Sequence, residues 1–217
     1  MMKGVNALAI AGAALCLALA ILLWLLARRP PTVALPARIT TISAGYPFAL
    51  RVKNQMDRAA HLTTVIIDFE RRGERFHAPQ ILYGFASPKA NGRVFAVTVD
   101  NTRGEAFLSL DVPNSPDNPL MPPRTLPPLD LSSVTRDISG VLEIARANGL
   151  DEFCALAGPE HGNVDLRLSN NSSACPVWSV LGDGWDERGP IADLAITIDA
   201  RTGSVLSRTV SKAANRP

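Results

Sequence analysis

Two cysteines, Cys154 and Cys175, are the residues of this chain best placed to do chemistry together. They bracket a segment rich in Gly, Asn and Ser, so an oxidised pair would close that loop and stabilise the fold by about 3 kcal/mol. We predict this disulfide, which would hold the segment against the strand that follows Cys175. Two reduced core thiols are the alternative, because buried free cysteine is common in bacterial cytoplasm. The third cysteine, Cys16, lies inside an apolar run.

Other arrangements of reactive side chains are weaker. Nucleophilic catalysis would need a histidine beside a cysteine and an orienting acid. The three histidines are scattered along the chain, at His61, His77 and His161. The acidic run Asp183–Glu187 lacks the alternating ligands and closing glutamate of a calcium loop, and we interpret it as part of a solvated hairpin loop. We therefore predict no catalytic residue, no metal site and no cofactor.

The charge of the chain argues against a nucleic-acid partner. It carries 22 Lys and Arg against 20 Asp and Glu, and Lys3, Arg28 and Arg29 flank an apolar N-terminal run. The remaining residues are therefore close to neutral. A nucleic-acid-binding protein would present a basic face instead.

That apolar run, Val5–Ala27, has no charged residue. As a helix it would cross roughly 30 Å of hydrocarbon. It ends in Arg28-Arg29 rather than in small residues, so we expect an uncleaved anchor over residues 1–29, in contact with membrane lipid through residues 5–27. The positive-inside count slightly favours a cytoplasmic C-terminal domain. The cysteine pair favours the periplasm, and we expect a single-pass protein of the bacterial inner membrane with a periplasmic domain.

A proline-rich spacer, residues 30–38, precedes a β-rich module at residues 39–112. The segment Pro47–Ala60 fits either a helix or a strand, and Pro47 as a first helical residue favours the helix. If the segment were a strand, Ile39–Val112 would instead form a β-sandwich. The β-branched run Leu62–Glu70 begins a series of predicted strands.

A second module follows a linker dense in proline, residues 113–130, which neither helix interiors nor central strands tolerate. This module, residues 131–211, opens with N-capping residues at Ser132–Thr135 and a helical spacing that ends at Asn148-Gly149. Strands and turns follow it. The last hairpin turn is built on Asp199, Thr202 and Gly203. Residues 212–217 form a tail.

The closing hairpins of the two modules match, FAVTVDNTRGEAFLSL at Phe95–Leu110 against LAITIDARTGSVLSRT at Leu194–Thr209. This match indicates an internal repeat or, alternatively, convergent turn chemistry. The second module, with SGVLEIARANG in its helix, WSV in a strand and ITIDARTGSVLS at its end, resembles PepSY-like domains of the bacterial envelope over about Val134–Val210. It departs from them in the insertion from Cys154 to Cys175 and in a loop at Gly182–Pro190.

The resemblance implies a helix packed on a small antiparallel sheet, and a non-catalytic binding or inhibitory module often associated with proteases. We therefore expect an α+β protein in which an N-terminal transmembrane helix precedes one or two such modules. Its partner would be an envelope protein or a protease. The alternative is an enzyme or small-ligand carrier with a pocket between the two modules, lined by Trp178, His161 and the Asp183–Glu187 loop.

Overall fold

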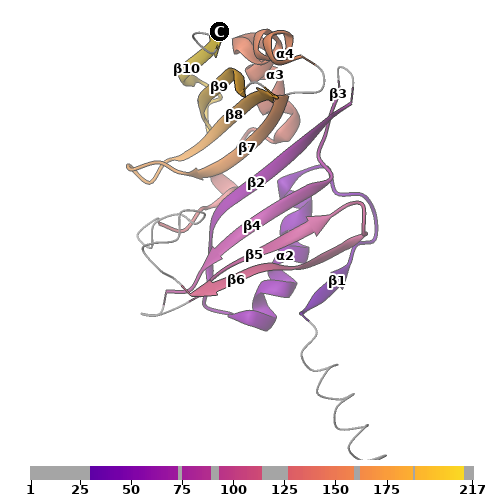
Figure 1. Ribbon diagram of the computed structural model, residues 1–217. Helices are drawn as coiled ribbons and strands as arrows, with labels where there is room; N and C mark the ends of the chain where they lie inside the picture. Colours follow the sequence, from indigo (N-terminus) through magenta and orange to yellow (C-terminus); the bar gives the residue numbers. More distant parts are fainter. Residues whose placement is uncertain are drawn as a thin grey trace, which may run out of the picture. The chain divides into compact units, whose positions relative to one another are not determined.

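One antiparallel sheet is the framework of the unit Thr32–Pro217 (Figure 1). The structure is a computed structural model that describes residues 30–72, 75–88, 93–113, 127–158, 162–187 and 189–212. The strands are β1 (Thr32–Ala34), β2 (His61–Arg72), β3 (Arg75–His77), β4 (Gln80–Ala86), β5 (Arg93–Asp100), β6 (Glu105–Pro113), β7 (Gly162–Asn170), β8 (Pro176–Asp186), β9 (Gly189–Asp199) and β10 (Val205–Lys212). The helices are α2 (Ile42–Met56), the 3-10 turn η1 (Leu131–Ser133), α3 (Ile138–Ala145), the π-type turn η2 (Arg146–Leu150) and α4 (Asp151–Ala157).

The sheet is continuous across the two halves of the chain, which we define as 32–113 and 127–212. Its strands follow the order β1-β6-β5-β4-β2-β7-β8-β9-β10, and β3 pairs with β2 beside this row. The halves join where β2 pairs antiparallel with β7, for example at Val65 opposite Leu168 and Ile67 opposite Leu166. The predicted fold class, a transmembrane helix followed by small separate modules, is therefore wrong, because one large sheet takes their place.

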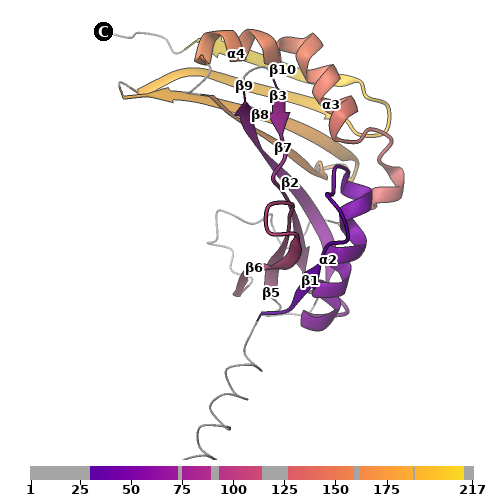
Figure 2. The same ribbon diagram turned by 90° about the vertical axis from the view of Figure 1, so that its right-hand side faces the viewer.

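The α-helices of the described residues, α2, α3 and α4, lie on the same side of this sheet (Figure 2). The residues that face them alternate along each strand, as Val164, Leu166 and Leu168 do in β7, and these three side chains are buried. α2 packs over β4, β5 and β6, while α4 packs over β8, β9 and β10. Because side chains alternate across a strand, one face of the sheet forms the core beneath the helices.

The segment Pro47–Ala60, which fits either a helix or a strand in the sequence, is largely helical. This agrees with the preference that we based on Pro47. α2 begins earlier than expected, at Ile42, so Pro47 lies in its second turn rather than at its first position. Thr41 caps the helix, since its hydroxyl accepts a hydrogen bond from the Ala44 N–H at 3.2 Å. A helix at this place rules out the β-sandwich alternative.

The second half contains one more helix than its sequence pattern predicts. Ser132 and its neighbours form the short turn η1, and α3 is capped instead by Asp137, whose Oδ1 accepts from the Ile138 N–H at 2.7 Å. Gly149, at a φ of 114°, ends this stretch as expected. α4 then forms where we expected a loop. Its Phe153 packs closely against Gly182 of the sheet: if residue 182 had a side chain, its Cβ atom would lie only 2.8 Å from the phenyl ring.

The two closing hairpins have the same turn. Asp100 Oδ1 accepts from the N–H groups of the second and third residues after it, and Asp199 Oδ1 does the same. Gly104 and Gly203 then adopt φ values of 67° and 77° and donate to the carbonyls of these two aspartates. The turn expected at Asp199, Thr202 and Gly203 is present, and each half is a helical segment followed by a four-stranded meander. Whether this reflects a duplication stays a prediction.

The expected anchor, Val5–Ala27, lies outside the described residues. Within the part of the chain that is described, no helix is both long and apolar enough to cross a membrane. The prediction of a single-pass inner-membrane protein is therefore corrected. Most of the expected linker, residues 114–126, also lies outside the described residues. The strands before and after it belong to one sheet, because β2 pairs with β7.

Asp137 lies in the connection between η1 and α3, yet we expect its side chain to contribute strongly to the stability of the fold. Its Oδ1 accepts from the Ile42 N–H at 3.3 Å as well as from Ile138, so one carboxylate serves the first residues of α2 and α3. We expect Asp137→Ala to lower the free energy of unfolding by about 1–2 kcal/mol, measured by urea denaturation. Asp130→Ala is the control, because Asp130 caps only the exposed turn η1. An equal loss in both variants would contradict the joint role of Asp137.

Candidate functional site

The cysteine pair does not form a disulfide, so this prediction is wrong. Cys154 is buried in α4, and Ala157, one turn later, packs beside Gly184 and Gly162 at one end of the β7–β8 hairpin. Cys175 lies at the other end, where its thiol contacts the Ser173 carbonyl at 3.6 Å. The length of β7 separates these ends by about 26 Å at ~3.3 Å per residue. A disulfide requires Cα atoms within about 7 Å.

The described residues expected to line the pocket of the alternative prediction lie in β8 and the turn after it. Trp178 is fully buried, and its indole N–H donates to the Arg136 carbonyl at 3.1 Å. The predicted loop Gly182–Pro190 is mostly strand, because β8 continues to Asp186 and β9 starts at Gly189. His161 lies outside the described residues. Among the described residues, no group of three or more His, Cys, Asp or Glu could hold a metal ion.

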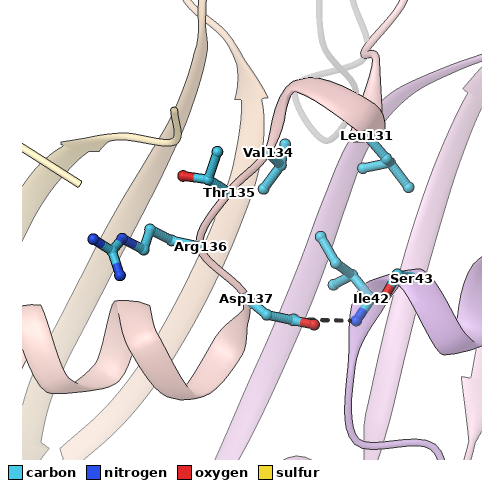
Figure 3. Close-up of a pocket in the computed structure, with 7 residues that line it drawn as sticks. All are labelled: Ile42, Ser43, Leu131, Val134, Thr135, Arg136 and Asp137. Carbon is cyan, nitrogen blue, oxygen red and sulfur yellow. Dashed lines mark hydrogen bonds between the residues drawn. The ribbon is translucent and has the colours of Figure 1, made fainter. Parts of the chain in front are cut away.

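A cavity of about 230 Å³ lies where α2 and α3 begin (Figure 3). Ile42, Ser43, Leu131, Val134, Thr135, Arg136 and Asp137 line it. Asp137 is already engaged by the two helix N-termini, and the Thr135 hydroxyl donates to the carbonyls of the turn after β9. Asp137 and Thr135 are thus used by the fold. We call the contact between the starts of α2 and α3, beside this cavity, the joint between the halves.

Tyr83 reinforces the joint from the sheet side. Its hydroxyl is buried and donates to the Ile42 carbonyl at 2.7 Å. Burial, with smaller contributions from Asp137 and Tyr46, raises the pKa of this phenol far above its ordinary value. Tyr83 therefore remains a hydrogen-bond donor and not an acid–base group at ordinary pH.

The strongest candidate for contact with another molecule is the face of β7, β8 and β9 that points away from the helices. We call it the open face and define it by Asp165, Ser179, Leu181, Asp183, Trp185, Asp193, Ala195 and Thr197. Most of these side chains are exposed, in contrast to the buried residues that alternate with them. Leu181 is 38% exposed and Trp185 56%, and they are two of the four exposed large apolar side chains in the described residues. No described layer covers this face.

Two pairs of like charges lie on the same side of the sheet, and Asp183 stands between Leu181 and Trp185 along β8. Asp68 of β2 stands directly opposite Asp165 of β7, and Asp183 of β8 stands directly opposite Asp193 of β9. Like charges placed opposite each other destabilise a sheet. Burial raises the pKa of Asp165 most, and the charges of Asp68 and Asp183 and a hydrogen bond with Asp68 raise it further. The positive charge of Arg167, two residues further along β7, lowers the pKa of Asp165 and so partly offsets this increase.

Our sequence reasoning found Asp183 but placed it in a loop, and it did not find the pairs. Alternation along each strand could have assigned Asp165, Asp183 and Asp193 to one face. Their opposition depends on strand register, which one sequence does not specify. The pairing of Asp68 with Asp165 depends further on the contact between the two halves.

Comparisons with known proteins do not assign a family. No family model matches the chain, and no curated protein matches it. Among solved structures, the crystal structure of a "putative lipoprotein" from Clostridium difficile 630 is similar over 79% of this chain and 93% of that one, at 13% identity and a TM-score of 0.44. A likeness at this level carries no argument about function.

The raised pKa of Asp165 gives the stability a pH dependence of definite sign. The folded state holds the Asp165 proton more tightly than the unfolded state, whose carboxyl pKa is about 3.8. The contribution of this group to stability is therefore most favourable below pH 3.8 and is lost as pH rises through the raised pKa. At pH 7, Asp165→Asn should raise the free energy of unfolding by about 0.5 kcal/mol.

The measurement is urea denaturation of both proteins from acid to neutral pH, with Glu143→Gln, an exposed change on α3, as control. The difference between Asp165→Asn and the unchanged protein should shrink toward pH 4. A difference that is constant with pH would show that repulsion in the pair is not its source.

Proposed function

We propose that this chain is a non-catalytic protein-binding module whose open face receives a basic segment of a partner protein. The observation that carries the proposal is the exposure of Leu181, which lies opposite Asp165, and of Trp185 on the face that also carries the pairs Asp68–Asp165 and Asp183–Asp193. Exposed aromatic and apolar side chains beside charged groups are a usual composition of a protein interface.

The exposed tryptophan supports a contact of this kind. Tryptophan is enriched among the residues that dominate binding energy, because it buries a large rigid area at a small entropic cost. On an isolated surface, its 56% exposure leaves apolar area in water without benefit. A partner that covers Trp185 and Leu181 would remove this area from water.

The aspartate pairs define the chemistry of the partner. Each pair holds two carboxylates opposite each other, and a lysine or arginine placed between them would relieve their repulsion. Such contacts specify a partner and accelerate its association more than they add affinity. A basic segment with apolar residues therefore fits the open face better than an acidic or neutral one.

The resemblance of the second half to PepSY-like domains supports the same class of function. In that family it implies a binding or inhibitory module, often beside proteases, and we propose an envelope protein or a protease as the class of partner. The helical side of the sheet is less suited to this role, since α2, α3 and α4 already cover it. We do not propose an enzyme or ligand carrier, because the carboxylate beside the cavity, Asp137, is engaged by the two helix N-termini.

A pair of peptides tests the proposal with the full chain. One peptide alternates lysine with leucine, and the other replaces each lysine by glutamate. The lysine peptide should bind at least tenfold more tightly by fluorescence anisotropy, and the difference should fall with added salt. Trp185→Ala should weaken binding of the lysine peptide about tenfold, the usual effect of removing an aromatic residue that dominates an interface.

Leu206→Ala is the matched control, because Leu206 is 54% exposed but lies on β10, at the edge of the sheet. Binding of the lysine peptide should not change in this variant. Equal affinity for both peptides, or an equal loss in the two variants, would contradict the proposed role of the open face.

A further inference from the structure

The repeated hairpins make the outer edges of β6 and β10 comparable residue by residue. Gly104 and Gly203 occupy the same place in identical turns, with the same hydrogen bonds and the same sign of φ. Counted from these glycines, Ala106 corresponds to Val205 and Phe107 corresponds to Leu206. β6 and β10 each form the last strand of the meander in their half.

The edge of β6 is covered by a short extended segment. β1 pairs antiparallel with it, with Val33 opposite Ala106 and Thr32 opposite Phe107. The N–H of Leu35, just after β1, donates to the Gly104 carbonyl at 2.8 Å. Val33 and Leu35 pack against the core, and Ala106 is fully buried.

The corresponding edge of β10 has no strand on it among the described residues, since β10 ends the row of paired strands. Val205 and Leu206, which occupy the places of Ala106 and Phe107, are 36% and 54% exposed. They are the other two exposed large apolar side chains of the described residues. Leu206 lies where the register with β9 shifts, so it has no partner on that strand.

We propose that the free edge of β10 at Ser204–Leu206 binds an extended segment of a partner protein, as β1 binds β6. The segment pairs antiparallel with β10, places a small or β-branched apolar residue opposite Val205, and donates a backbone N–H to the Gly203 carbonyl. Adding a strand to an exposed edge is a recurrent mode of peptide recognition, in which backbone hydrogen bonds supply affinity and side chains supply selectivity.

The charge of β10 distinguishes the partner from a second copy of this chain. β10 contains Arg208 and Lys212 and no acidic residue. Two copies paired through β10 would bring these basic strands together, which is unfavourable. Arg208 already reaches an acidic group, with its Nη2 2.8 Å from Glu152 Oε2, and both side chains are about half exposed. The bound segment therefore carries acidic residues before its apolar part, where antiparallel pairing brings them alongside Arg208 and Lys212.

The test uses a fluorescent peptide in which glutamates precede the sequence Thr-Val-Ala-Leu of residues 32–35. The full chain should bind this peptide, and Leu206→Glu should weaken binding at least tenfold, because it removes an apolar contact and places a like charge beside the glutamates of the peptide. Leu181→Glu is the matched control: it places the same charge on the open face and should leave binding unchanged. A peptide with its leucine N-methylated cannot donate to Gly203 and should also bind at least tenfold more weakly.

Three results would overturn the proposal: no binding of the peptide, equal binding by the Leu206→Glu variant, or equal binding of the N-methylated peptide. A dimer in solution that Leu206→Glu dissociates would also overturn it, because a second copy would then occupy the edge. The site is independent of the proposed function, since Trp185→Ala should impair binding of the lysine peptide alone.

Discussion

The pairing of β2 with β7 is the interaction on which the rest of this structure depends. It aligns Thr64–Phe69 with Val164–Ser169 and makes one sheet from two meanders. Because side chains alternate along both strands, this register places the apolar residues of both halves on the same side. With this register, α2, α3 and α4 can cover the apolar face of both halves together. The same register brings Asp68 opposite Asp165 on the other side, so the core and the charged pair arise from one ladder.

The pairing also explains the joint between the halves. With both halves on one sheet, the starts of α2 and α3 come together, and the Asp137 carboxylate serves both. Tyr83, on β4 of the sheet, holds the first turn of α2 by donating a hydrogen bond to the Ile42 carbonyl. The cavity beside Asp137 therefore lies where the two halves pack together. The surfaces that we propose for partners are the open face and the edge of β10, where the exposed large apolar side chains of the described residues lie.

The sequence predicted those features that depend on local chemistry. The Asp-to-Gly turns were recognisable because an aspartate that bonds nearby N–H groups and a glycine with positive φ act within five residues. α3 followed from apolar spacing, whereas the spacing in Pro47–Ala60 fitted either a helix or a strand and Pro47 favoured the helix that became α2. α4 was missed because it is short and its case rests on Phe153 meeting Gly182, a contact between distant segments. The disulfide failed for the same reason: loop composition does not specify which end of a hairpin each cysteine occupies.

The candidate surfaces were less accessible to sequence reasoning than the elements that carry them. Trp178 and Trp185 lie in the same strand, yet one is buried and the other exposed, because β8 alternates between the faces of the sheet. Treating Gly182–Pro190 as a loop removed the alternation that would have placed Asp183 and Trp185 on one face with Leu181. The edge at Val205 and Leu206 becomes visible only when β10 is compared with β6, whose edge is occupied.

Hydrogen exchange of the backbone amides in β2 and β7 tests the central claim, that the halves form one sheet. If they do, the amides of Thr64–Phe69 and Val164–Ser169 should exchange with the same free energy, equal to that of global unfolding, because neither strand can open without the other. Distinct exchange free energies, with one strand exchanging through separate unfolding of its half, would contradict the account.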